Sequence, residues 1–449
     1  MEVAVIQKKE TKLVPKLRFP EFNEGWISNL LGNVTNYTKG FAFKSDDYKS
    51  EGVRIVRVSD LGVNSIKKDI DKVFVDTVFS KSHGKYLLHK NNIIITTVGS
   101  KPEMIESAVG RGIFIYENNQ GLLNQNMLKF ENIDSFDNGF LQGIINSKRY
   151  QYFIKGIARG NANQSNITVK DLLNFKLNIP SLPEQQKIAS FLSTVDTKIQ
   201  QLQRKKELLE QYKKGAMQQI FSQKIRFKPA LSEVEGREDD RSDYQDWEEK
   251  QLGDVLTFIS TNSFSRNDLN YEEGEVYNIH YGDIHTKFKS NFHLSSEEVP
   301  FINSNISLSK ISDEKLCILG DVVIADASED YNDIGKAIEI INTNNQKIVA
   351  GLHTFLGRDF ENSTIVGFKC YLFQTDYIRK QIMRIAQGIS VLGISKKNLS
   401  KISFELPCKE EQQKIADFLS AIDNKIDKTV EQIESTQQFK KGLLQQMFV

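Results

Sequence analysis

The stretch PEQQKIASFLSTVD at residues 183–196 decides the fold of this chain, because the chain contains it twice. Residues 410–423 read EEQQKIADFLSAID, so ten of the fourteen positions are identical at a constant offset of 227. The same offset carries Lys213-Lys214-Gly215 onto Lys440-Lys441-Gly442, and no gap interrupts the match from Pro180 to Phe221. A gap-free match of this length indicates an internal duplication, which organises the whole chain.

Each copy of the repeated stretch continues with apolar residues at heptad spacing, which predicts a long helix. We place these helices at residues 181–223 and 408–449. Roughly 37 residues rising about 1.5 Å each would give a rod of ~55 Å, which is longer than a small domain is wide. An ordinary helix packed on its own domain would not need this length. We therefore expect the two helices to pair as an antiparallel coiled coil with pseudo-twofold symmetry.

The expected seam between the two helices is mostly apolar. Its members are Ile188, Leu192, Val195, Ile199, Leu202, Leu209, Ile415, Leu419, Ile422, Ile426, Ile433 and Leu443. Four polar residues also occupy seam positions, namely Lys206, Lys213, Thr429 and Thr436. Polar residues inside such a seam fix the register of the helices at some cost in stability, and we expect that role here.

Short β-rich runs separated by turn signals precede each helix, so the fold class is α+β with two mixed, β-rich domains. The predicted divisions are an N-terminal tail (1–15), a first β-rich domain (16–180), the central helix (181–223), a linker (224–246), a second β-rich domain (247–407) and the C-terminal helix (408–449). The linker is acidic and polar and is expected to be exposed. Between the two β-rich parts only scattered anchors match, such as Trp26 with Trp247. This pattern is expected of two modules that share a scaffold and recognise different targets.

Composition excludes several classes of protein. No apolar run approaches the ~20 residues that cross a bilayer, and the first residues lack a secretory signal, so we expect a cytoplasmic protein. Three scattered cysteines (Cys317, Cys370, Cys408) form no CxxC pair. The formal net charge is only +1, whereas a nucleic-acid binder usually carries a basic excess. If the chain binds DNA, the positive charge is local or another subunit supplies many phosphate contacts.

Motifs of catalysis are missing from the sequence. It contains no P-loop, GxGxxG, HExxH, GxSxG or EF-hand pattern, and no NPPY-like motif of adenine methyltransferases. His280 and His285 flank Asp283, but surface placement is favoured over metal binding. The acidic loop from Asp326 to Asp333 has three readings: a solvated turn, a divalent-ion site, or DNA recognition through cytosine N4. The sequence therefore predicts neither a catalytic nor a metal site.

The two EQQKIAxFLSxxD segments, the Trp-xxxx-Leu-Gly openings and the two long helices together resemble one family. It is the specificity (S) subunit of type I restriction–modification systems, and the resemblance covers about residues 15–449. It implies a non-catalytic DNA-recognition subunit in which each β-rich domain reads one half of a bipartite site. It also implies that the helices form a spacer on which two methyltransferase (M) subunits dock, with restriction (R) subunits in the full complex. S-adenosylmethionine and ATP with Mg²⁺ are then expected on those partners, and no cofactor on this chain.

Candidate DNA contacts are polar, basic or aromatic residues in the turns of the β-rich domains. In the first domain they are Lys39, Phe41, Lys44, Thr97, Ser100, Lys101, Arg159, Asn161, Asn163, Gln164 and Ser165. In the second domain they are His280, Tyr281, Ser328, Tyr331, Gln387, Ser390, Ser395 and Lys396. For any single one, a structural or phosphate contact is favoured over a base contact. Asn124-Gln125-Asn126 and the corresponding His353 could equally be buried groups that the backbone satisfies.

Two other functions compete with DNA recognition. A coiled-coil scaffold that does not bind DNA would explain the helices but not two divergent β-rich modules. An endonuclease or methyltransferase with an unrecognised site would need catalytic motifs that the sequence does not show. Methylation by the chain alone, compared with methylation in the presence of a partner methyltransferase, distinguishes the enzyme from the recognition subunit.

Overall fold

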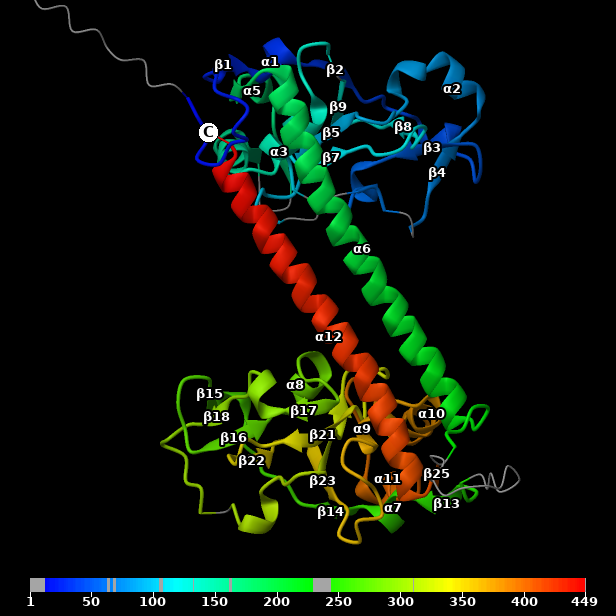
Figure 1. The fold of residues 1–449 in the computed structure, drawn as a ribbon. Coiled ribbons are helices and arrows are strands. Elements are labelled where there is room, and N and C mark those ends of the chain that lie inside the picture. The colour runs from blue at the N-terminus through cyan, green and yellow to red at the C-terminus, as the bar shows by residue number, and fades with distance from the viewer. Residues whose placement is uncertain are drawn as a thin grey trace, which may run out of the picture. The chain divides into compact units, whose positions relative to one another are not determined.

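The computed structural model describes residues 13–62, 65–67, 70–104, 108–131, 133–160, 164–228, 244–309 and 311–448. The chain forms two compact units: unit 1 comprises Met1–Arg204 and Val430–Val449, and unit 2 comprises Lys205–Thr429. Helices α6 (Leu182–Phe221) and α12 (Lys409–Gln446), green and red in Figure 1, each contribute one half to either unit. Each unit therefore consists of a β-rich body and two helix halves.

The body of unit 1 is organised around an antiparallel sheet with strand order β2-β9-β5-β7 (Figure 1). These strands are β2 (Asn36–Lys39), β9 (Met127–Glu131), β5 (Ile93–Thr96) and β7 (Gly112–Phe114). All four residues of β5 are buried, as expected for a central strand covered on both faces. A second sheet contains β3 (Val53–Val56), antiparallel to β4 (Val73–Val75) and parallel to β8 (Leu122–Leu123).

The other elements of unit 1 connect these sheets to helix α6. Strand β1 (Ile27–Leu30) pairs antiparallel with β12 (Lys176–Ile179), which leads directly into α6. A small sheet joins β10 (Arg159–Gly160), β11 (Ser165–Asn166) and β6 (Val98–Gly99). The shorter helices are α1 (Leu31–Val34), α2 (Val78–Ser82), α3 (Asn138–Ile145), α4 (Lys148–Ile157) and α5 (Val169–Leu173). Asp137, Ser147 and Thr168 cap the last three through their side chains.

Unit 2 contains a five-stranded sheet with the order β14-β23-β19-β21-β17. Its strands are β14 (Thr257–Ile259), β23 (Thr354–Arg358), β19 (Val322–Ala325), β21 (Ala337–Asn342) and β17 (Asn291–His293). A four-stranded sheet combines β15 (Leu269–Asn270), β18 (Phe301–Ile302), β16 (Val276–Ile279) and β22 (Lys347–Ala350). Strands β17 and β21 are parallel, as are β16 and β22.

The described part of unit 2 also contains two strand pairs and five short α-helices. Strand β13 (Glu248–Gln251) pairs with β25 (Ser403–Leu406), which leads into α12, and β20 (Ala327–Ser328) pairs with β24 (Leu392–Gly393). The helices are α7 (Leu252–Val255), α8 (Tyr281–Thr286), α9 (Lys369–Leu372), α10 (Asp376–Ile385) and α11 (Lys396–Leu399). The order β14-β23-β19-β21 repeats the order β2-β9-β5-β7 of unit 1. The duplication therefore extends through both bodies, well beyond the scattered sequence anchors.

The seam between α6 and α12 is apolar in each unit. In unit 1, Ile188, Leu192, Val195, Ile199 and Leu443 join the core of the body. In unit 2, Met217, Ile220, Ile415, Leu419 and Ile422 do the same. The expected seam residues Leu209, Ile426 and Ile433 are only half-buried, and Leu202 is buried. A helix half thus forms one wall of each domain core, which explains why the seam pattern is strongest near the bodies.

One ion pair in each unit joins the two helices. Lys440 lies 2.5 Å from Asp196 in unit 1, and Lys213 lies 2.7 Å from Asp423 in unit 2. From the first pair to the second, the residue number rises along α6, from 196 to 213, and falls along α12, from 440 to 423. The two helices are therefore antiparallel. The aspartate that ends one copy of the repeated stretch meets the first lysine of the other copy's Lys-Lys-Gly. The predicted α+β fold with antiparallel, pseudo-symmetric helices is confirmed.

The other polar seam residues bond within their own helices. Lys206 pairs with Glu210 one turn away at 3.5 Å. The hydroxyls of Thr429 and Thr436 donate to the carbonyl oxygens of Lys425 and Gln432. Of the four polar seam residues, Lys213 forms the ion pair to the other helix. The expected role of these residues in fixing the register is therefore supported for Lys213.

The glutamate of the repeated EQQ sequence anchors the start of α6 in unit 1. Glu184 is buried and accepts two hydrogen bonds of 2.7 Å from the guanidinium of Arg18. The indole Nε1 of Trp26 donates a third, at 3.2 Å. Charge-assisted, bidentate bonds of this kind are the strong ones in proteins. The segment before the first strand is thereby fixed against the helix.

The same anchor recurs in unit 2 with equivalent residues. Glu411 accepts from the guanidinium of Arg226, at 2.8 Å for the shorter bond, and from Nε1 of Trp247 at 2.9 Å. The neighbouring Phe227 packs edge-on against Phe418 of α12 at 5.6 Å. The predicted linker 224–246 therefore begins with residues that contact unit 2, and residues 229–243 lie outside the described part of the chain.

The first glutamine of the EQQ sequence holds the strand that leads into each helix. The amide of Gln185 donates to the carbonyl oxygen of Pro180 at 3.0 Å and accepts from the backbone N–H of Asp137 at 2.9 Å. Gln412 makes the equivalent bonds to Pro407 and Ile365. The identity of the repeated stretch thus has a structural cause, because its polar residues satisfy buried backbone groups.

Candidate nucleic-acid interface

Three segments of unit 1 meet beside the end of strand β5. The backbone N–H of Thr97 donates to the carbonyl oxygen of Asn126 at 2.8 Å, and the carbonyl oxygen of Thr97 accepts from the N–H of Ile167 at 2.9 Å. The pairing of β6 with β11 continues from this point. We call this arrangement the strand junction of unit 1. It holds the side chains of Thr97 and Asn126 on a fixed backbone.

Unit 2 has the same strand junction at the end of β19. The N–H of Asp326 donates to the carbonyl oxygen of His353 at 3.0 Å, and the N–H of Ile394 donates to the carbonyl oxygen of Asp326 at 3.0 Å. The pairing of β20 with β24 continues from it. The backbone connections match those of unit 1, whereas threonine and asparagine are replaced by aspartate and histidine.

The second position of each junction has an unusual backbone conformation. Asn126 has φ 67° and His353 has φ 56°, both in the left-handed region. Few residues other than glycine adopt this conformation, although asparagine and histidine are enriched there. Both side chains are exposed. A costly conformation kept in both units at an exposed side chain is a reason to suspect function.

Aromatic and charged groups gather around the junction of unit 2. Nδ1 of His353 lies 3.4 Å from Oδ1 of Asp326, and the ring of Tyr281 lies 5.3 Å from that of His353. Tyr281 also stacks on His280 at 4.7 Å. Nδ1 of His280 accepts from the N–H of Gly282, which fixes the turn into α8. The junction is therefore bordered by a rigid aromatic wall.

Electrostatics at this wall keep His280 neutral. Burial, together with the nearby Arg266 guanidinium, lowers the pKa of His280 to about 4. Arg266 is held by two hydrogen bonds to the buried carboxylate of Asp283, at 2.8 and 2.9 Å. Neutral His280 can accept a hydrogen bond through Nδ1 at physiological pH, as its contact with Gly282 requires.

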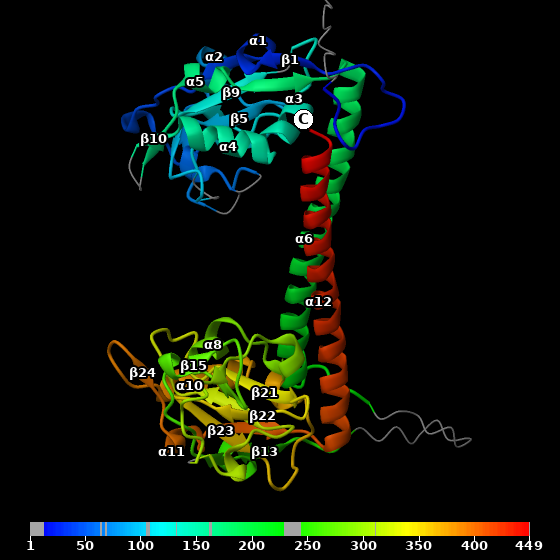
Figure 2. The same cartoon turned by 90° about the vertical axis from the view of Figure 1, so that its left-hand side faces the viewer.

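A hairpin with an apolar tip rises next to the junction of unit 2, at β24 (Figure 2). Gln387 and Gly393 pair at its base, and Ile389 and Val391 at its tip are exposed. The turn needs glycine, because Gly388 has φ 140° and a Cβ there would lie 1.9 Å from the carbonyl oxygen of Val391. Exposed apolar side chains on a loop tip are available for contact with a partner.

The structure divides the predicted contacts of unit 2 into two groups. His280 and Tyr281 lie at the junction, and Tyr331, Gln387 and Ser390 are exposed. The others serve the fold: Ser328 is buried and accepts from the N–H of Asp330, Ser395 caps α11, and the ammonium of Lys396 lies 5.7 Å from the ring of Phe355.

Sequence reasoning left two central residues of the junction out of the candidate contacts. For the acidic loop that begins at Asp326 the sequence leaves a solvated turn, a divalent-ion site and DNA recognition open, and it allows His353 to be a buried group. The offset of 227 places His353 on Asn126, but it does not place Asp326 on Thr97, which lies 229 residues earlier. Because Asn126 is exposed and left-handed, the pair marks a shared scaffold position.

The predicted contacts of unit 1 are more dispersed. Thr97 lies at the junction, and Lys39, Lys44, Lys101 and Gln164 are exposed. Arg159 is also exposed and pairs with Asp171 at 3.1 Å. The others contact the fold: Phe41 lies against Phe43 and His83, Ser165 is buried in β11, and Ser100 bridges to Ala108. Asn161 and Asn163 lie outside the described residues.

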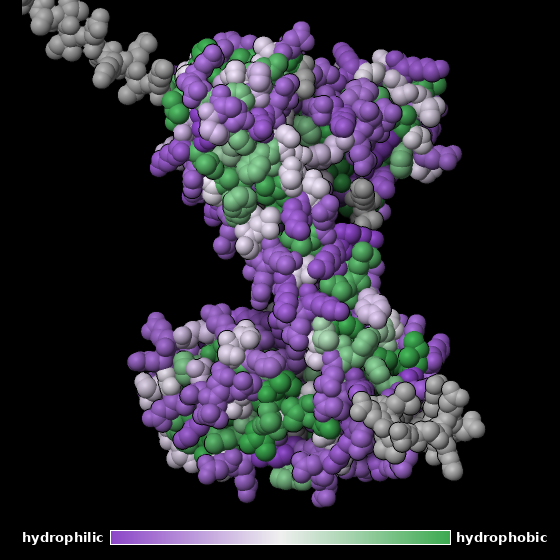
Figure 3. Space-filling view, in the orientation of Figure 1, coloured by the Kyte–Doolittle hydropathy of each residue, from purple (hydrophilic) through white to green (hydrophobic). Residues whose placement is uncertain are grey.

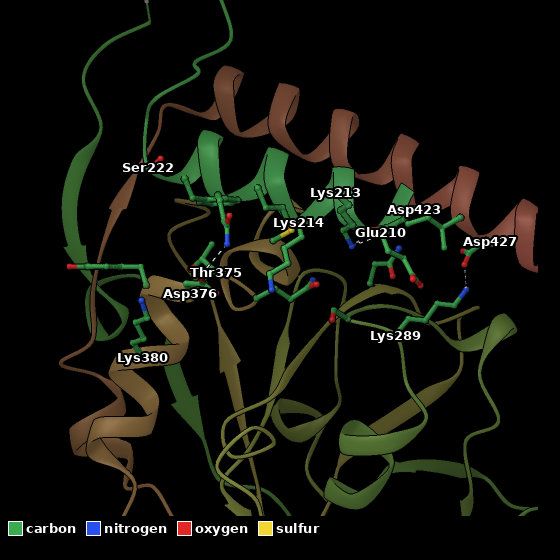
Figure 4. A pocket seen from close by; sticks show the side chains of 18 of the residues that line it. Glu210, Lys213, Lys214, Ser222, Lys289, Thr375, Asp376, Lys380, Asp423 and Asp427 are labelled. Carbon is green, nitrogen blue, oxygen red and sulfur yellow. Dashed lines mark hydrogen bonds and ion pairs between the residues drawn. The ribbon is translucent and has the colours of Figure 1, made fainter. Parts of the chain in front are cut away.

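A groove in unit 2 follows the two helices beside the Lys213–Asp423 pair (Figure 4). It has a volume of ≈ 880 Å³, and Lys289 and Asp427 form a second ion pair across it at 2.7 Å. Unit 1 has a groove of ≈ 400 Å³ at the equivalent Asp196–Lys440 pair. Ion pairs thus join the walls of both grooves. Within the described residues, no group of three or more His, Cys, Asp or Glu could hold a metal ion.

The surface is mostly hydrophilic on the face that Figure 3 shows, with apolar patches in both units. In the part of the chain that the structure describes, no helix is both long and apolar enough to span a membrane.

Comparisons with known proteins agree with one another. The family model for the type I restriction modification DNA specificity domain matches residues 23–211 and again 244–435. The specificity subunit of the type I restriction enzyme MjaX of Methanocaldococcus jannaschii is 24% identical over 98% of this chain and 97% of its own length. The EcoAI specificity subunit of Escherichia coli is 30% identical over 32% of this chain and 23% of its own.

Solved structures show the same fold. The type I S subunit from M. genitalium superimposes with a TM-score of 0.57 at 17% identity, covering 97% of this chain and 99% of that chain. A chain from a study of type I R-M complex assembly and conformational transition gives 0.52 at 15% identity, with 94% and 97% coverage. The two matches of the family model coincide with the two repeats and cover most of the sequence. The chain therefore belongs to the type I restriction–modification DNA specificity family and is a specificity subunit, which recognises DNA sequence with two domains.

Proposed function

We propose that this chain reads a bipartite DNA site, with each unit reading one half-site, and that it performs no catalysis itself. The observation that carries the proposal is the strand junction, which repeats its backbone while its side chains differ. Such an arrangement suits two readers of different sequences, because base contacts specify while a common scaffold positions them. A scaffold without DNA binding would have no use for two divergent junctions.

The cofactors of the system belong, in this proposal, to partner subunits. S-adenosylmethionine would bind to the methyltransferase subunits, and ATP with Mg²⁺ to the restriction subunits. The sequence supports this assignment, because it lacks a P-loop and an NPPY-like motif.

We further propose that two methyltransferase subunits dock on the helices, one on each unit. Tyr212 on α6 and Phe439 on α12 are equivalent at the offset of 227, and they are 56% and 54% exposed. A large aromatic side chain exposed twice at the same position is best explained by two copies of one partner, since aromatic residues are enriched at protein interfaces. Partner subunits would also supply phosphate contacts, in keeping with the net charge of +1.

Methylation of a random-sequence DNA library tests the function. The chain is purified alone and together with the methyltransferase subunit of its own system, and methylated positions are read by single-molecule sequencing. We expect methylation only from the complex, at one bipartite motif. Methylation by the chain alone would show that it is an enzyme, and methylation without a sequence motif would contradict the recognition function.

Helix length provides a second test, because we propose that α6 and α12 set the gap between half-sites. Four residues are inserted in Gln200–Glu210 and four at the equivalent 427–437 of α12. At about 1.5 Å per residue the insertion adds ~6 Å, or roughly two base pairs. We expect a longer gap between unchanged half-sites. Changed half-sites with the original gap would refute this role.

A further inference from the structure

We propose that Asp326, oriented by His353, is the side chain with which unit 2 reads a cytosine in its half-site. This inference rests on the proposed function, in which each unit reads one half of a DNA site. A carboxylate accepts a hydrogen bond from the N4 amino group that cytosine presents in the major groove. Adenine is disfavoured, because its N7 acceptor lies beside its N6 amino group and would face the negative carboxylate.

One oxygen of the Asp326 carboxylate lies beside the imidazole of His353, and the other does not. Oδ1 lies 3.4 Å from Nδ1 of His353, which can donate when that nitrogen carries a proton. Among the described residues, the second oxygen has no hydrogen-bond donor. The side chain is 23% exposed, so this oxygen can be reached from solvent. A half-buried carboxylate with an unfilled acceptor is suited to a donor that arrives with a ligand.

Hydrogen bonds fix the backbone that carries this carboxylate before DNA binds. The N–H and carbonyl oxygen of Asp326 are both bonded, to His353 and Ile394, in the strand junction. His353 is held in its left-handed conformation with the ring of Tyr281 against it at 5.3 Å. A side chain held in place by such neighbours loses little conformational freedom on binding, which favours specificity.

Unit 1 supplies the comparison that points to recognition rather than to folding. If the carboxylate and imidazole were needed to form the junction, unit 1 would require them too. Unit 1 forms the same backbone hydrogen bonds with the neutral side chains of Thr97 and Asn126. The carboxylate and the imidazole are therefore dispensable for the junction, and they alter what that position offers to DNA.

The test compares variants of the full complex of this chain with its methyltransferase subunit. Each complex methylates a random-sequence library, and the preferred base at every position is measured. We expect Asp326→Asn to reduce the preference for cytosine at one position of one half-site by about fivefold or more. The other half-site and the gap should remain those of the unaltered complex.

Glu329→Gln is the matched control. Glu329 lies three residues away and is exposed, so the same loss of charge should leave every preference unchanged. The reciprocal variants Asp326→Thr and Thr97→Asp should each change one position, in different half-sites. Thermal unfolding verifies that each complex is folded. If Asp326→Asn methylates nothing, competition binding with duplexes altered at single positions replaces the methylation readout.

The inference is overturned if Asp326→Asn keeps every base preference, if the affected base is adenine, or if Glu329→Gln has the same effect. Failure of the proposed function would look different. In that case the unaltered complex would show no bipartite motif, whereas failure of this inference leaves that motif in place and independent of Asp326.

Discussion

The helix anchors and the strand junctions both occur once in each unit, but the two units share different features at each: the side chains at the anchors and the backbone bonds at the junctions. At the anchors the side chains are the same, since Glu184 and Glu411 each bind an arginine and a tryptophan. At the junctions the backbone bonds are the same and the side chains differ. The contrast separates what both units must share, the attachment of the helices, from what can differ between them, the surface offered to DNA. Each half of this comparison can be tested.

The largest effect is expected from breaking an anchor. Glu184→Ala leaves the mostly buried guanidinium of Arg18 and the indole N–H of Trp26 without their acceptor. Removing one partner of a buried ion pair costs about 3–5 kcal/mol of unfolding free energy. Glu411→Ala should cost less, because Arg226 keeps bonds to the carbonyl oxygens of Tyr244 and Gln245. Urea unfolding followed by hydrogen exchange, resolved by unit, measures both losses.

Glu184→Gln is the control, since an amide oxygen can still accept one bond. It should recover part of the lost stability. Equal losses for the two alanine variants would mean that the additional carbonyl contacts of Arg226 contribute nothing. A loss of unfolding free energy below about 1 kcal/mol in unit 1 would mean that the anchor stabilises the fold no more than a solvent-exposed salt bridge does.

A second, smaller effect concerns pH and unit 2. Burial and Arg266 lower the pKa of His280 to about 4, partly opposed by Asp283, while an exposed histidine titrates near 6.5. Between these values the unfolded chain binds a proton that the folded chain does not. Stability is therefore fully present above pH 6.5 and falls as the pH approaches 4. At pH 5 unit 2 should lose about 1–2 kcal/mol relative to pH 7.

His280→Asn isolates this contribution, because an amide oxygen can replace Nδ1 as acceptor for Gly282 and does not titrate. The variant should show a smaller loss of unit 2 stability between pH 7 and 5. The pKa values of His285 and His293 are also lowered by burial, so some dependence should remain. An unchanged pH dependence in the variant would show that His280 does not contribute to it.

The sequence was sufficient to predict the helices, because heptads and a repeated stretch are local patterns. It predicted the junctions poorly, because a junction forms between segments that are distant in the sequence and pair only in the folded domain. Thr97, Asn126 and Ile167 are far apart in the chain, and no local pattern links them. Ser328 and Ser395 are the opposite case, because their residue type suggests DNA contact while their hydroxyls bond to local backbone. Hydrogen-bonding side chains in turns cannot be assigned to one of these roles without knowing the fold.

The smallest effect is expected at the ion pairs between the helices, and it should differ between the units. Lys213→Ala removes a pair in which Asp423 also accepts from the hydroxyl of Tyr371 at 2.9 Å, and it removes the ammonium 5.1 Å from that ring. Lys440→Ala removes the equivalent pair with Asp196. We expect losses of about 1 kcal/mol for Lys213 and ~0.5 kcal/mol for Lys440, measured by urea unfolding resolved by unit.

Reversing the charges within a pair decides whether it sets the register of the helices. Lys440→Asp combined with Asp196→Lys should restore most of the stability that Lys440→Asp alone removes, because among the described residues no other charged group is bonded to this pair. The same exchange in unit 2 should restore less, since the hydroxyl of Tyr371 would lose its acceptor at Asp423. Equal recovery in both units would show that Tyr371 contributes nothing, and no recovery in either would mean that apolar packing alone fixes the register. The pseudo-symmetry of the helices would then lie in their apolar seams rather than in the lysines and aspartates that the repeated stretch preserves.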